Sequence, residues 1–234
     1  MTTQTAATTK QNPFIDLIVS IVIPTLILMK LSGADNLGPM GALLLALAFP
    51  LVWGLYELIV HKKKNFVAIL GIISVLLTGG IGVLELDNKW LAIKEAAIPA
   101  AIGIGVLISS YTKFPLVKTL LYNPKVLNVD KINGKLEESD NKLQFEKQLL
   151  RANFLLAGTF FFSAVMNYAL AKWVVVSPSG TEAFNQELGK MMAMSYPVIA
   201  IPSMIMMLGI FYYLWRTINR LSGLELEEVM AVKE

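Results

Sequence analysis

One segment decides the fold: residues 84–99 read LELDNKWLAIKEAAIP. It lies between two apolar runs, Phe66–Val83 and Ala96–Ile108. Each run approaches the roughly 20 residues that a helix needs to cross a bilayer. The segment therefore predicts a bend at which the chain leaves the membrane and returns. Asp87 is placed to cap the returning helix with its carboxylate, and Trp90 belongs at the level of the lipid headgroups.

Composition also indicates a membrane protein. The chain has 234 residues, of which 55% are hydrophobic and 16% are charged, and its mean hydropathy is +0.60. Soluble domains rarely combine these values, and here the apolar residues occur in runs. The absence of cysteine excludes disulfides and thiolate metal sites, and a single histidine excludes a multi-histidine metal site. We therefore predict no metal and no cofactor.

Continuous apolar runs predict an all-α, polytopic membrane protein with six transmembrane helices, because only helices and closed barrels span lipid. The helices pair as three hairpins, and the second helix of each carries an apolar or aromatic residue before a proline, at Pro50, Pro99 and Pro197. We interpret this pattern as a weak internal repeat. The predicted spans are approximately Phe14–Leu31, Met40–Val60, Phe66–Leu84, Leu91–Tyr111, Leu149–Ala171 and Met191–Trp215.

Lysine and arginine set the predicted orientation, because basic residues gather in cytoplasmic loops. They cluster at residues 61–64 (HKKK), between the fourth and fifth spans, and after the sixth span, so both termini are predicted to be cytoplasmic. Within the long loop, Asn133-Gly134 predicts a tight turn. The predicted regions are a disordered cytoplasmic tail at 1–12, transmembrane helices one to four at 13–111, a cytoplasmic loop with an amphipathic helix at 112–148, transmembrane helices five and six at 149–216 and a cytoplasmic tail at 217–234.

Small residues predict that the third and fourth spans pack closely. Residues 78–82 (TGGIG) remove side-chain bulk near the outer end of the third span. Ala97, Ala101 and Gly105 follow one another at intervals of four on one face of the fourth span. Such faces let helix backbones approach closely in membranes.

Polar residues near the predicted outer ends of the spans form the candidate site. Lys94 lies one turn inside the fourth span and can snorkel back to the interface, whereas the shorter Glu95 is expected to find a protein partner. Lys30 is placed to pair with Glu85 or Glu95. Two interpretations stay open: an outward-facing polar pocket for a lipid headgroup or small solute, or a structural cluster of ion pairs. The candidate residues are Lys30, Glu85, Asp87, Trp90, Lys94, Glu95 and Asn167.

Two hairpins carry a family pattern. The middle one has Thr78-Gly79-Gly80 and then Asp87, Trp90 and Lys94 before a new apolar run, and the third has Asn167 and then Phe184-Asn185 before Lys190. Together they resemble the bacterial intracellular septation protein A family, and the whole chain is similar to uncharacterised Gram-negative inner-membrane relatives of that family. The resemblance implies a multi-pass protein of the bacterial inner membrane that is associated with envelope integrity or division.

The sequence favours a protein that is not an enzyme, since it lacks a glycine-rich phosphate loop, a G-x-S-x-G motif and a zinc-binding His-Glu helix motif. We expect a non-enzymatic protein that binds other envelope or division proteins, has the lipid bilayer as its other partner and binds no nucleic acid. A small-molecule or lipid transporter with an outward-facing polar pocket is the alternative, and an intramembrane enzyme is the third class considered.

Overall fold

The computed structural model describes residues 17–60, 66–112, 115–122, 124 and 127–230. The predicted tail at 1–12 and the basic cluster at 61–64 lie outside these residues. The chain divides into two compact units, which are considered separately. Unit 1 comprises residues 1–94 and 170–194, and unit 2 comprises residues 95–169 and 195–234.

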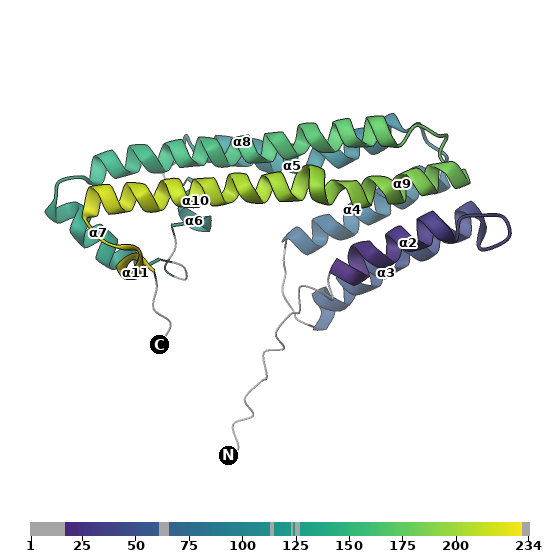
Figure 1. Cartoon of the computed structure of the whole chain (residues 1–234), viewed down its shortest axis with the longest axis horizontal. Helices are drawn as coiled ribbons and strands as arrows, with labels where there is room; N and C mark the ends of the chain where they lie inside the picture. The colour runs from purple at the N-terminus through teal and green to yellow at the C-terminus, as the bar shows by residue number, and fades with distance from the viewer. Residues whose placement is uncertain (1–16, 61–65, 113–114, 123, 125–126, 231–234) are drawn as a thin grey trace, which may run out of the picture. The chain divides into compact units, whose positions relative to one another are not determined.

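The described residues are helical apart from their connections and one isolated β-bridge (Figure 1). The elements are η1 (Ile18–Val22), α2 (Ile23–Lys30), α3 (Gly38–Val60), α4 (Phe66–Val83), α5 (Lys89–Ser109), α6 (Leu116–Leu120), α7 (Val129–Glu138), α8 (Lys142–Val174), α9 (Glu182–Ser195), η2 (Tyr196–Ala200), α10 (Ile201–Ser222) and α11 (Leu226–Val229). The prediction of an all-α fold is confirmed.

Four helices among the described residues are long and apolar enough to cross a membrane, as expected of a multi-pass membrane protein. They cover Gly38–Tyr56, Lys89–Ser109, Lys142–Val174 and Glu182–Ser222, and thus match the predicted second, fourth, fifth and sixth spans. The predicted first and third spans correspond to shorter apolar helices, Ile18–Lys30 and Ile69–Val83.

In unit 1, α3 packs against both α2 and α4 (Figure 1). Two glycines of α4 face α3: a Cβ on Gly82 would collide with Leu43, and one on Gly79 would lie 3.1 Å from Leu47 Cδ1. Gly79 and Gly82 therefore let the second and third spans approach, as small residues do between membrane helices. The expected close packing of the third and fourth spans stays a prediction.

Two π-helical segments mark prolines. η1 ends just before Ile23-Pro24, and η2 ends just before Ile201-Pro202. At each step the isoleucine N–H bonds the carbonyl five residues earlier, Ile18 O or Tyr196 O, rather than the usual fourth. Proline lacks an N–H, and its ring crowds the carbonyl of the residue four positions earlier, so a widened turn accommodates it.

In unit 2, α8 and α10 run side by side (Figure 1), and a hydrogen bond of 3.0 Å joins their hydroxyls at Ser163 and Ser203. A hydrophobic core continues past these helices into α6, α7 and α11. A β-bridge between Leu127 and Met230 attaches the end of the chain beside this core. α8 begins at Lys142 and α10 continues to Ser222, so both helices extend beyond the predicted fifth and sixth spans.

The predicted turn at Asn133-Gly134 is wrong, since both residues lie inside α7. Asn128 caps this helix, because its side chain accepts a hydrogen bond from Lys131 N–H. Ile132 and Leu136, four residues apart on one face, are fully buried in the unit 2 core. Burial of this apolar stripe outweighs the turn preference of Asn-Gly. At the start of the predicted cytoplasmic loop at 112–148, α6 is a helix of five residues.

Candidate functional site

The predicted residues of the middle bend lie at its turn. Asp87 Oδ1 accepts a hydrogen bond of 2.8 Å from the N–H of Lys89, the first residue of α5, so Asp87 caps the returning helix as expected. Its other oxygen lies 3.7 Å from Lys89 Nζ. Glu85 is exposed and adopts the left-handed conformation with φ of 51°. Trp90 is half exposed, as expected for a side chain at a headgroup boundary.

Lys94 is a buried cation of unit 1, with 8% of its surface exposed. Its Nζ donates to Thr78 Oγ1 at 2.7 Å and to Ser74 Oγ at 3.2 Å, and so joins α5 to α4. The prediction that Lys94 snorkels to the interface is therefore wrong. The hydroxyls one turn apart on α4 solvate the ammonium group inside the helix pair.

The remaining candidates are divided between the two units. Lys30 is exposed, and no ion pair joins it to Glu85 in the described part of unit 1. Glu95 and Asn167 belong to unit 2. Asn167 Nδ2 donates to Ser163 O of its own helix at 2.8 Å, which is a local contact. Of the seven predicted residues, Lys30, Glu85, Asp87, Trp90 and Lys94 belong to unit 1.

A hydrogen-bonded loop network in unit 1 contains residues that the candidate site omits. Asn88 Nδ2 donates to Ser177 O at 2.7 Å and to Val175 O at 3.2 Å. Ser179 Oγ donates to Leu86 O at 2.7 Å and lies 3.0 Å from Asn88 Oδ1. The loop of the middle hairpin is thereby bonded to the loop of the third hairpin.

The same network fixes α9 in two ways. Glu187 accepts from the backbone N–H groups of Val176 and Ser177 and from Ser177 Oγ, each at 2.8 Å. Asn185, which is buried, donates to Ser32 Oγ at 3.1 Å and to Pro39 O at 2.6 Å in the first hairpin. The sequence signal was the run of turn-forming and polar residues at 177–180 and 185–187, but their partners are distant along the chain.

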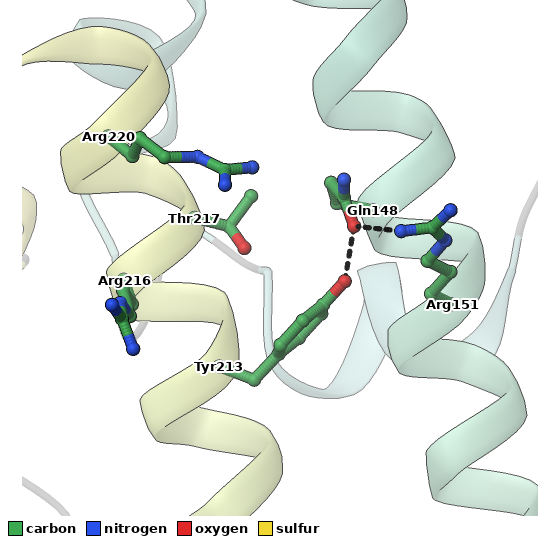
Figure 2. A pocket seen from close by; sticks show the side chains of 6 residues that line it. All are labelled: Gln148, Arg151, Tyr213, Arg216, Thr217 and Arg220. Carbon is green, nitrogen blue, oxygen red and sulfur yellow. Dashed lines mark hydrogen bonds between the residues drawn. The ribbon is translucent and has the colours of Figure 1, made fainter.

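A second polar region, in unit 2, is a pocket of about 300 Å³ between α8 and α10 (Figure 2). We call it the arginine pocket, and it is lined by Gln148, Arg151, Tyr213, Arg216, Thr217 and Arg220. Gln148 Oε1 accepts from Tyr213 Oη and, at 3.4 Å, from Arg151 Nη1. In the sequence, the basic residues of these segments predict only the orientation of the chain. The missed signal is the spacing of residues 213, 216, 217 and 220, which places four side chains on one helix face.

Comparison with known proteins gives no relative: no family model, curated protein or solved structure matches the chain. The resemblance to the septation protein A family therefore stays a prediction, and function is argued from the chain's own residues.

Proposed function

We propose that this chain is a non-enzymatic, six-span protein of the bacterial inner membrane, with both termini cytoplasmic, that acts in the cell envelope by binding other envelope proteins. The observation that carries the proposal is the loop network of unit 1. Hydrogen bonds from Asn88, Ser179 and Asn185 join segments of three different hairpins. A surface that is ordered before binding loses less conformational entropy when a partner docks.

The loop network also supports the proposed topology. The loops that carry few basic residues, at 33–39, 85–89 and 173–181, include the segments that the network brings together. Six spans place all three on the side opposite the lysine-rich segments. The two short apolar helices, Ile18–Lys30 and Ile69–Val83, would then complete the three hairpins.

One observation favours the transporter alternative. Lys94 is a buried ionisable residue between two apolar helices, where such groups often mark substrate or ion pathways. For transport of a small molecule or lipid, Ser74 and Thr78 would exchange their bonds to Lys94 for bonds to the substrate. In the scaffold proposal the same bonds only hold α4 against α5.

The test is affinity capture of the tagged full chain from bacterial membranes in mild detergent, followed by mass spectrometry of proteins and lipids. We expect a stoichiometric envelope protein, lost when the exposed carboxylates of the first loop and of the start of α9 are reversed in Asp35→Lys/Glu182→Lys. Glu227→Lys, an exposed reversal in α11, is the control and should retain the partner. A chain purified without a protein partner would refute the scaffold proposal. Solute flux in liposomes that Lys94→Met abolishes would establish the alternative.

A further inference from the structure

The arginine pocket carries positive charge that no carboxylate neutralises among the described residues. Its lining includes three arginines and no carboxylate. Across the described residues, no ion pair involves Arg151, Arg216 or Arg220. Exposed lysines of the same unit behave differently: Lys131 pairs with Glu228 at 2.9 Å, and Lys135 pairs with Glu138 at 2.7 Å. The unpaired arginines are therefore a local feature of the pocket.

Gln148 adds an uncharged hydrogen-bond donor to the three arginines of the pocket. Gln148 Oε1 already accepts from Tyr213 and Arg151, so its amide nitrogen is the part of the side chain left to donate. Figure 2 shows Arg220 extending from α10 toward Gln148 while Arg151 turns toward Gln148 from α8. Guanidinium groups present donors in a planar fork that matches phosphate oxygens two at a time.

We propose that the arginine pocket binds a phosphate group, which is carried by an anionic phospholipid or by a soluble phosphate. The volume of about 300 Å³ lies at the lower end of ordinary ligand sites, and is suited to a headgroup or a small phosphate ester. Basic pockets between membrane helices are known to take anionic lipid headgroups. The inference is independent of the envelope partner proposed above.

The surroundings of the pocket favour the lipid source. Arg216 continues along α10 into Tyr212 and Leu208, at intervals of four, and both are more than half exposed. On α8, Arg151 is followed four residues later by Leu155, which is also half exposed. Acyl chains of a lipid whose phosphate occupies the pocket would lie on these apolar side chains. A soluble phosphate gains nothing from them.

The experiment is native mass spectrometry of the full chain in mild detergent, with phosphatidylglycerol, cardiolipin or phosphatidylcholine titrated in separate samples. Isothermal titration with inorganic phosphate forms the soluble arm. We expect one anionic lipid per chain, held about tenfold or more tighter than phosphatidylcholine. Binding of inorganic phosphate without a lipid preference supports the pocket and assigns it to a soluble ligand.

The variants distinguish a site from general positive charge. Arg151→Gln/Arg220→Gln should weaken anionic binding about tenfold or more, whereas Lys131→Gln/Lys135→Gln removes the same charge outside the pocket and should change it less than about twofold. Arg220→Lys retains charge and folding but loses the planar fork, so an intermediate loss is expected. Equal loss in the two double variants, no effect of Arg220→Lys, or no preference for any phosphate anion would overturn the proposal.

Discussion

Replacement of Asn153 is expected to lower the free energy of unfolding of unit 2 strongly. It is completely buried at the cytoplasmic end proposed for α8. Its Oδ1 accepts from Val117 N–H at 2.8 Å, and its Nδ2 donates to Val106 O at 2.8 Å and to Ser110 Oγ at 2.8 Å. One amide thus connects α8 with α6 and the end of α5.

The substitution Asn153→Leu keeps the branching and the number of side-chain heavy atoms, so it leaves no cavity and the expected loss is assigned to hydrogen bonding. It leaves Val117 N–H buried without an acceptor, which costs about 1–3 kcal/mol, and removes two donated bonds at about 1 kcal/mol each. The sum predicts that the free energy of unfolding falls by about 3–5 kcal/mol.

Asn167→Leu is the matched control, because it makes the same chemical change on the same helix. Its Nδ2 bonds only Ser163 O, a carbonyl of its own helix, so the expected loss is about 1 kcal/mol or less. Equilibrium unfolding in mild detergent, followed by tryptophan fluorescence, measures both variants. Equal losses for the two variants would refute the assignment of a structural role to Asn153.

Two further predictions concern other parts of the chain. Gly189→Ala should destabilise unit 1 by about 1–3 kcal/mol, because the new Cβ would lie 2.8 Å from Met29 Cγ. Gly209→Ala is the control: a Cβ there meets open space, so the melting temperature should be unchanged or higher. The hydrogen bond from Lys131 lowers the pKa of Glu228 below its ordinary 4.5, so this contact contributes fully above pH 4.5 and is lost as pH falls through the lowered pKa. Hydrogen exchange of α11, corrected for intrinsic rates, should be faster in acid than near neutral pH. Lys131→Ala should remove this dependence of the exchange rate on pH. If the variant keeps the same pH dependence, the role assigned to the Lys131–Glu228 contact is contradicted.

The helices could be predicted from sequence because their signal is local. A run of apolar residues specifies a spanning helix without reference to its neighbours, and α3, α5 and α8 follow from such runs. The turn predicted at Asn133-Gly134 was wrong because the local preference of this pair for a turn is weaker than the packing of α7 in the core. Ile132 and Leu136 gain more from burial in the unit 2 core than the turn would provide.

The site was harder to predict because its contacts join distant positions. Lys94 could be identified as an unusual charge near lipid, but Ser74 and Thr78 are ordinary residues of an apolar run until α4 lies beside α5. The arginine pocket shows the same limit. Gln148 and Tyr213 are separated by 65 positions and meet only when α8 and α10 pack.

The two units use their polar side chains for different purposes. In unit 1, Asn88, Ser179 and Glu187 bond mainly to backbone groups of neighbouring loops, so their hydrogen bonds mainly stabilise the structure. In unit 2, Arg216 and Arg220 are held on a helix beside a pocket, and neither has an acidic partner in the part of the chain that the structure describes. The fold does not require basic residues of this unit to stay unpaired, because Lys131 and Lys135 form ion pairs with carboxylates. Unneutralised guanidinium groups beside a preformed pocket are instead what recognition of an anion requires.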